Sequence, residues 1–137
     1  MRIPKDWREA LYKRFKFFKM WDTETRSWVR KDKGEVWAAC GPGWYTILWE
    51  LGEHIEEELE KMTQEERGSF EIADIKEKFG GLRFYCYGNE AIEKWISKAE
   101  DESYKTCEQC GKPGKNKRVN GWIYTVCKKH TPKEKKI

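Results

Sequence analysis

Four residues near the end of the chain have the types and the spacing of a metal site. Cys107 and Cys110 form a Cys-x-x-Cys pair, and Cys127 and His130 form a Cys-x-x-His pair, with sixteen residues between the two pairs. A two-residue gap lets a tight turn aim both side chains at one point, so the two pairs can surround a single ion. Three thiolates and one imidazole fill the four tetrahedral positions of Zn²⁺ and leave none for a substrate. The pattern predicts one structural zinc ion.

The residues between the two pairs predict the turns that bring the four ligands together. Gly111 directly follows the first pair, where a tight turn favours a positive φ angle. Asn120-Gly121 lies between apolar residues and is a strong signal for a two-residue hairpin turn. We therefore expect residues 105–131 to form a zinc-ribbon or treble-clef-like module, and the basic tail 132–137 to be frayed.

Catalytic chemistry fits the sequence less well. A Cys-x-x-Cys redox site would follow a βαβ pattern, which the sequence lacks. His54-Ile-Glu56 and the first cysteine pair superficially match the motifs of a zinc deaminase, but Thr106 replaces the proline of that motif. His54 also falls on the polar side of a glutamate-rich helical pattern. We expect no enzyme activity, with a deaminase-like enzyme as the remote alternative.

Composition favours one small domain with a highly charged surface. The 137 residues are 38% hydrophobic and 38% charged, and eight tryptophans can build much of a core from few positions. The five cysteines do not resemble a disulfide framework, so Cys40 and Cys86 are expected to stay reduced. The sequence has no signal-type apolar stretch and no apolar run of about 20 residues. We expect a soluble cytoplasmic protein that does not bind membranes, and its oligomeric state is left open.

Charge is spread unevenly along the chain, although the net charge is only +4. Residues 1–20 carry seven basic and two acidic side chains, and residues 105–137 carry ten and two. Residues 50–66 carry eight glutamates and one lysine. Two basic ends and an acidic middle predict either an oriented electrostatic surface or an exterior held by ordinary salt bridges.

The rest of the chain, residues 1–104, is expected to form the α+β body that carries the metal module. Apolar residues recurring at steps of three and four predict three amphipathic helices, over residues 5–20, 44–62 and 90–103. The first of these helices is basic, and Asn89 is placed to cap the last. Alternating patterns around turn residues predict two β-hairpins, over residues 26–40 with a turn at 31–34 and over residues 69–88 with a turn at Gly80-Gly81.

The second hairpin has two faces of different chemistry if Gly80-Gly81 is its turn. Side chains alternate along each strand, so the predicted register sorts them between the faces. The core face would hold Ala73, Ile75, Glu77, Phe79, Leu82, Phe84 and Cys86. The opposite face, which we call the basic-aromatic face, would hold Lys76, Lys78, Arg83, Tyr85 and Tyr87, with Asp74 and Ile72 further along.

The basic-aromatic face is the first candidate ligand surface, and the metal module supplies a second. Lysine and arginine can bind phosphate while tyrosine stacks on a base, so the face suits nucleic acid or a nucleotide. Ordinary cross-strand pairing on an outward surface, or cover by another element, are the alternatives. In the metal module the corresponding candidates are Lys115, Lys117, Arg118 and Trp122.

Several short motifs occur in the order found in a known group of proteins. These are Lys76-Glu-Lys-Phe-Gly-Gly-Leu-Arg-Phe-Tyr85, the Thr106-Cys-Glu-x-Cys-Gly-x-Pro-Gly114 run, Gly121-Trp122 and Thr125-x-Cys-x-x-His130, with Cys40-Gly-x-Gly-Trp44 upstream. The chain resembles, over roughly residues 40–130, a family of small proteins common in bacteriophages and prophages. The resemblance implies a phage-type origin and a zinc-finger-like end, but no particular activity, and the first 35 or so residues lie outside it.

These observations favour a non-enzymatic zinc protein that binds nucleic acid through basic and aromatic side chains. The alternative is a phage anti-defence protein that inhibits a host defence protein or sequesters a nucleotide signal. Its contact patch for a protein would be formed by Trp28, Trp37 and Trp44. Strongly salt-dependent binding to random DNA would favour the first reading. Tight binding to one protein or nucleotide, without DNA binding, would favour the second.

Overall fold

The computed structural model describes residues 2–22, 24–29 and 36–135 and confirms the predicted α+β class. The helices within these residues are α1 (Trp7–Arg14), α2 (Tyr45–Glu60), α3 (Gln64–Gly68) and α4 (Glu90–Ser103), with short 3₁₀-helices at Lys16–Phe18 and Pro42–Trp44. The strands are β1 (Met20–Asp22), β2 (Ser27–Val29), β3 (Ala38–Ala39), β4 (Glu71–Lys78), β5 (Gly81–Tyr87), β6 (Lys115–Val119) and β7 (Trp122–Val126).

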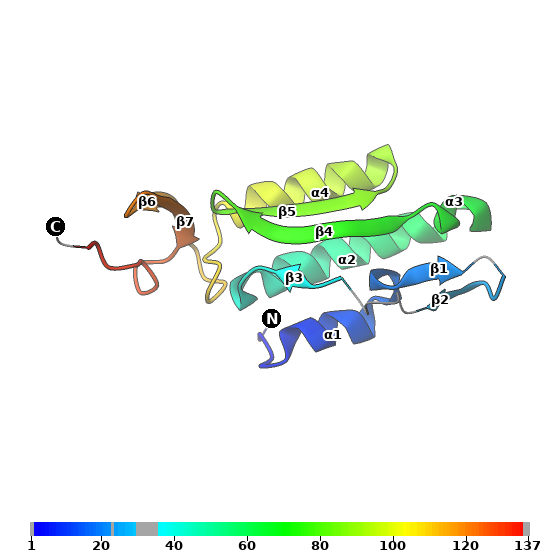
Figure 1. Cartoon of the computed structure of the whole chain (residues 1–137), viewed down its shortest axis with the longest axis horizontal. Coiled ribbons are helices and arrows are strands. Elements are labelled where there is room, and N and C mark those ends of the chain that lie inside the picture. Colours follow the sequence, from blue (N-terminus) through cyan, green and yellow to red (C-terminus); the bar gives the residue numbers. More distant parts are fainter. Residues whose placement is uncertain (1, 23, 30–35, 136–137) are drawn as a thin grey trace.

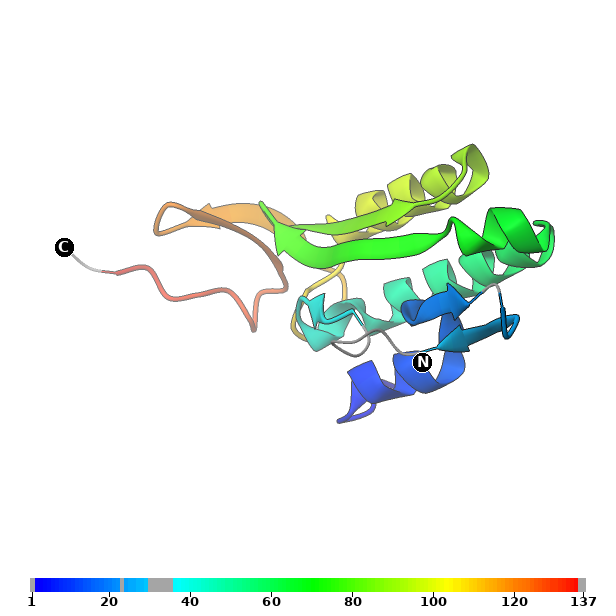
Figure 2. The ribbon, with the colours of Figure 1, turned by 45° about the vertical axis from the view of Figure 1, so that its right-hand side comes forward.

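A three-stranded sheet in the order β3-β4-β5 is the centre of the body, with β3 parallel to β4 and β5 antiparallel to it. Helices α2 and α4 pack against each other, and α4 packs against β5 (Figure 1). The β6–β7 hairpin lies beyond one end of this body, and α3 lies at the opposite end (Figures 1 and 2). The metal module therefore projects from the end of the sheet where the β4–β5 turn lies.

The apolar stripe of α2 provides the central surface of the core, as the helical spacing predicts. Leu48, Leu51, Ile55 and Leu59 on this stripe are all buried. Each such side chain contributes roughly 1.5–3 kcal/mol when it leaves water. Gly52 lets the α1 segment approach, because a Cβ atom there would lie 2.7 Å from the ring of Phe15. The core predicted from periodicity is therefore present.

The predicted N-terminal helix is shorter than expected. Instead of running over residues 5–20, α1 ends at Arg14, and Phe15 has an extended backbone before a 3₁₀ turn. Phe15, Phe17 and Phe18 are all buried. An α-helix would point Phe17 away from the other two rings, because residues two apart do not share a helix face. Burial of three aromatic rings therefore ends the helix.

The predicted hairpin over residues 26–40 is wrong in its pairing. Strand β2 pairs instead with β1, where Trp28 lies opposite Trp21, and β3 pairs with β4. The turn of the β1–β2 hairpin uses the Asp22 carboxylate, which accepts hydrogen bonds from the backbone N–H groups of Glu24 and Thr25. This is an Asx turn, a local signal that the sequence analysis did not use. The predicted turn at 31–34 lies outside the described residues.

The second hairpin forms over the expected residues, but its turn is shifted by one position. Phe79 and Gly80 have φ angles of 54° and 79°, and Lys78 pairs with Gly81, so Phe79-Gly80 is the primed turn. Phe79 is consequently 61% exposed, which corrects its predicted place on the core face. The Glu77 carboxylate accepts a hydrogen bond from Gly80 N at 2.7 Å and stabilises this turn.

A β-bulge makes the predicted side-chain orientation wrong at the other end of β4. The register shifts between Ile72 and Asp74, so Ala73 is exposed and Ile72 is 1% exposed within the core. A bulge adds one residue to one strand and reverses which side chains point inward beyond it. The prediction had placed Ala73 inside and Ile72 outside. Between the bulge and the turn the predicted faces are present, and Ile75 and Phe84 are buried.

Helix α4 has the bounds predicted for the last helix of the body. The Asn89 side chain accepts a hydrogen bond from Ile92 N at 3.0 Å and caps its first turn. Helix α3 was not predicted, although it begins with a capping box between Thr63 and Glu66. Among the described residues, no helix is both long and apolar enough to cross a lipid bilayer.

Candidate metal centre and the surfaces around it

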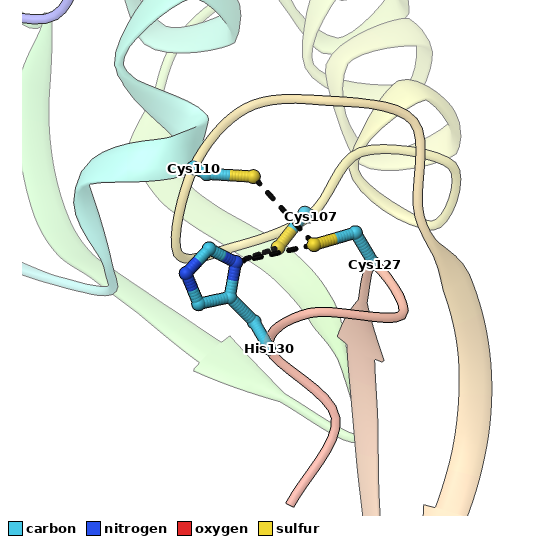
Figure 3. Close-up of side chains that lie close together, drawn as sticks. All are labelled: Cys107, Cys110, Cys127 and His130. Carbon is cyan, nitrogen blue, oxygen red and sulfur yellow. Dashed lines mark hydrogen bonds between the residues drawn. The ribbon is translucent and has the colours of Figure 1, made fainter.

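The four predicted metal ligands come together at one point (Figure 3). Their ligand atoms all lie within 4.8 Å of one another. Cys110 Sγ lies 3.8 Å from Cys127 Sγ, and His130 Nδ1 lies 3.7 Å from Cys107 Sγ and 3.1 Å from Cys127 Sγ. Zinc–ligand bonds of 2.0–2.3 Å in a tetrahedron require edges of roughly 3.5–3.8 Å. Two of these three separations match such edges and the third is shorter, so the donor set and its close spacing are compatible with one tetrahedral ion. They do not identify the metal.

The first ligand pair is held by a turn of the expected kind. Gly111 N donates to Cys107 O at 2.9 Å, and Cys107 N donates to Lys112 O at 2.8 Å. Gly111 has a φ angle of +80°, as predicted. The backbone N–H of Glu108 donates to Thr125 O on β7 at 3.0 Å, which ties the first pair to the hairpin.

The β6–β7 hairpin places the second pair opposite the first. Asn120 and Gly121 have φ angles of 53° and 84°, and Val119 pairs with Trp122, so the predicted Asn-Gly turn is present. The hairpin returns the chain to Cys127, and a further turn brings His130 N to within 3.2 Å of Cys127 O. The predicted order of a ligand turn, a hairpin and a second ligand turn is therefore present.

Backbone hydrogen bonds prepare two of the cysteines for ionisation. Burial opposes ionisation of Cys107, but N–H groups from Cys127, Cys110 and Gln109 outweigh it and lower the pKa of the thiol. Cys127 has a lowered pKa for the same reasons, with His130 N as its leading donor. Burial and the neighbouring sulfurs raise the pKa of Cys110. A bound cation would reduce the repulsion between neighbouring thiolates. Cysteines bind a metal as thiolates, so this arrangement suits a metal site.

The remaining two cysteines lie outside the cluster and have no such activation. Burial raises the pKa of Cys40 to about 12 and that of Cys86 to about 12. Both are free thiols, as expected. Their high pKa values make them unreactive at neutral pH, because the thiolate is the nucleophilic form.

The tail after Pro132, predicted to be frayed, contacts the turn of the β6–β7 hairpin. The Asn120 side chain donates to Lys133 O and accepts from Lys135 N, both at 2.9 Å. Residues 132–135 have no regular secondary structure. The last two residues of the chain lie outside the described part.

The metal module is packed directly on the body through the segment that follows β3. Gly41 N donates to the Glu108 carboxylate at 2.9 Å, and Gly43 N donates to Glu108 O at 2.7 Å. Trp44 is buried and donates from Nε1 to Thr106 O at 3.0 Å, which corrects its predicted place in a partner-facing patch. The Cys40-Gly-Pro-Gly-Trp44 run is thus the docking site for the first ligand pair, a role that the sequence analysis did not identify.

The tip of the β4–β5 hairpin makes a second contact with the module. The Thr125 hydroxyl donates to Gly80 O at 2.5 Å, and Asn116 Nδ2 donates to Phe79 O at 3.2 Å. A Cβ atom on Gly80 would lie 2.4 Å from Asn116 Nδ2. The two hairpins that carry the candidate ligand residues therefore meet end to end.

The basic-aromatic face is only partly available for binding. Tyr85 and Tyr87 are exposed, but the Lys76 ammonium lies 3.4 Å from the Asp74 carboxylate. Arg83 donates to the Glu100 carboxylate on α4 at 2.7 Å, which neutralises its charge locally. Among the predicted basic residues of this face, Lys78 is the one without an ion pair in the described part of the chain. Much of the predicted positive charge of this face is therefore compensated.

The positive charge of the candidate binding residues in the metal module is less compensated than that of the basic-aromatic face. Lys115 and Arg118 are exposed, Lys117 is half-buried, and none of the three forms an ion pair with another described residue. Trp122 is 71% exposed beside the Asn-Gly turn. A cationic surface with an exposed indole is therefore present on the β6–β7 hairpin.

The deaminase-like grouping of motifs is not assembled. His54 lies on α2 and stacks on the ring of Trp95, with 3.5 Å between the ring centroids. It is half-buried, not on an open polar face as the helical pattern had suggested. The group that could hold a metal among the described residues contains the two Cys-x-x-Cys/His pairs and not His54.

The fold and this cluster define a small α+β protein with a Cys₃His group that could hold one metal ion. Comparison of the chain with protein-family models, with curated proteins and with solved structures gives no match. Any functional assignment therefore depends on the chemistry of the residues described above.

Proposed function

We propose that the protein is a non-enzymatic zinc protein that binds nucleic acid through the metal module. Zinc is the metal that best suits this site, because three thiolates and one imidazole in a closed tetrahedron are its characteristic structural ligand set. The site offers four protein ligands and so has the composition of a structural site. Its role is to hold the β6–β7 hairpin in place.

Uncompensated positive charge beside an exposed indole is the observation that carries the nucleic-acid proposal. Exposed lysine and arginine attract the phosphate backbone through charge, while an exposed aromatic ring can stack on a base. Trp122 supplies the exposed ring, and the register places Lys115 and Lys117 on the same face of the hairpin. Arg118 adds an exposed charge on the opposite face. Tyr85 and Tyr87 add further exposed rings on β5.

Affinity for a single-stranded oligonucleotide as a function of salt tests this proposal. We expect binding that weakens as salt increases, with a slope in log–log form of about −0.7 for each phosphate neutralised. The Arg118→Ala/Trp122→Ala variant should bind at least about tenfold more weakly, because stacking on one base contributes roughly 1–3 kcal/mol. The matched control is Lys94→Ala/Lys98→Ala, which removes two exposed lysines from α4 and should bind as the unmodified protein does. Salt-independent binding, or none, contradicts the proposal.

A protein partner is a second candidate, and one exposed tryptophan favours it. Trp37 is 62% exposed, and the Arg8 guanidinium lies 3.9 Å from its ring centroid. Arg8 is held in place by hydrogen bonds to Ala38 O and Cys40 O. Tryptophan and arginine are enriched at energetically dominant interface positions. The phage-type origin and an anti-defence role remain predictions, and a Trp37→Ala variant that loses capture of one host protein would support them.

A further inference from the structure

A cleft in the metal module is lined by three lysines. It has a volume of about 350 Å³ and lies between the start of β6, the end of β7 and the second ligand pair. Pro113 and Val126 form apolar parts of its wall, and its charged lining consists of Lys115, Lys117 and Lys128. No carboxylate occurs among the described residues that line it. The cleft is therefore a concave, cationic site.

The register of the hairpin places these lysines together. Lys115 and Lys117 are two residues apart on β6, so their side chains share one face of the strand. Lys115 pairs with Val126 on β7, and the chain reaches Lys128 two residues later. Two of the ammonium groups come from β6, and the third comes from the turn between Cys127 and His130 that follows β7.

Lys117 is held in one orientation by neighbouring groups. Its Nζ donates to the Thr131 hydroxyl at 2.7 Å, and that hydroxyl donates to Cys127 O at 2.9 Å. An ammonium has three N–H donors, so two remain for a ligand. Fixing a long side chain before binding reduces the entropy that binding would cost. The cleft therefore contains one pre-oriented cation next to the metal centre.

The metal centre does not supply enough negative charge to neutralise the cleft. A divalent ion with three thiolates and a neutral imidazole carries a net charge of −1. Three ammonium groups carry +3, and within the described part of the chain none of them forms an ion pair. An anion that enters a concave site reduces the repulsion between the like charges that line it. The remaining excess of about two positive charges matches one phosphate monoester, or two phosphodiesters of a nucleic-acid backbone.

We propose that the cleft is a phosphate-binding site. Its volume lies within the range of small-molecule sites, and lysine binds phosphate as a point charge without reading a base. Two ligands could supply the phosphate. One is the backbone of a nucleic acid, and for this ligand the inference rests on the proposed function. The other source is a free nucleotide, which presents the same chemistry. A strand held here would be bound by its backbone, independently of its sequence.

Three affinities distinguish nucleic acid from free nucleotide as the ligand of the cleft. They are those of the whole zinc-loaded chain for a thymidine oligonucleotide, for ATP and for inorganic phosphate. The test variant is Lys115→Gln/Lys128→Gln, which keeps the Lys117–Thr131 hydrogen bond, and Lys117→Gln is a second variant. Lys94→Gln/Lys98→Gln on α4 is the matched control. Native mass spectrometry and melting temperature establish that each variant keeps its metal and its fold.

We expect the cleft double variant to bind each phosphate ligand at least about tenfold more weakly. Its salt slope for the oligonucleotide should fall by about 1.4, which corresponds to two lost phosphate contacts. If the variant binds the oligonucleotide with an unchanged slope, the cleft is not the site, although the proposed function stands. If the unmodified protein binds only ATP or phosphate, and the variant does not, the cleft is confirmed and the nucleic-acid proposal fails. If the unmodified protein binds no phosphate ligand, both are overturned.

Discussion

Replacing Cys110 by Ser releases the metal and unfolds residues 105–131. This is the largest effect we expect from one substitution, because the module has only a small apolar core of its own. Four of its residues are buried: Cys107, Val119, Thr125 and Val126. So small an apolar core does not offset the conformational entropy of about 27 ordered residues. In such sites the free energy of metal binding is folding free energy, with apparent values of roughly 10–16 kcal/mol.

Metal content by native mass spectrometry and hydrogen exchange across residues 105–131 measure this outcome. The unmodified chain should carry one zinc ion and protect the backbone amides of β6 and β7, whereas Cys110→Ser should lose both. A chelator should produce the same loss in the unmodified chain. The control is Cys86→Ser, because this half-buried thiol lies outside the cluster and its loss should leave the metal content unchanged. A Cys110→Ser protein that kept its zinc and its melting temperature would sink the structural-site assignment.

Short-range patterns predicted the metal ligands and the last helix of the body because their signals are local. The ligand pairs need only two-residue gaps and an Asn-Gly turn, all within 24 residues of sequence. Helix α4 needs only its apolar repeat and the Asn89 cap. In both cases the residues that decide the structure are close neighbours along the chain.

The turn of the β4–β5 hairpin was predicted at the wrong position because residues 79–81 can form two alternative two-residue turns. Gly80-Gly81 has the better local propensity, since Phe79 must adopt a positive φ angle in the turn that forms. Contacts distant in sequence reverse this preference. Gly81 packs against the ring of Tyr104, and Gly80 O accepts a hydrogen bond from Thr125. A single sequence does not reveal that these residues meet.

The charge of the basic-aromatic face was overestimated for a similar reason. The alternation of side chains along β5 correctly placed Arg83 on the face opposite the core, but its partner Glu100 comes from α4 at the edge of the sheet. Strand patterns give the direction of a side chain and not the neighbours that other elements bring to it. The same limit applies to the contact between Glu108 and the segment Gly41–Trp44, whose partners are more than 60 residues apart.

The second large prediction concerns residues 41–44, which attach the metal module to the body. A Cβ atom on Gly43 would lie 2.0 Å from Cys107 O and 2.5 Å from the carbonyl carbon of Glu108. Both are backbone atoms of the first ligand turn, so no flexible side chain can move aside. Gly43→Ala must therefore separate the segment from the turn and break the hydrogen bond from Gly43 N to Glu108 O.

We expect Gly43→Ala to lower the free energy of unfolding by about 3 kcal/mol or more, at the upper end of the cost of overpacking. Thermal unfolding should show a fall in melting temperature of about 10 °C. The zinc affinity should also fall, because the displaced Cys107 carbonyl belongs to a metal ligand. Gly88→Ala is the control, since a Cβ atom there would meet only Ile92 side-chain atoms and Cys86 Sγ, the nearest at 3.2 Å. If Gly43→Ala melts as Gly88→Ala does, the module is not docked through this segment, and its position would depend on the β4–β5 hairpin tip alone.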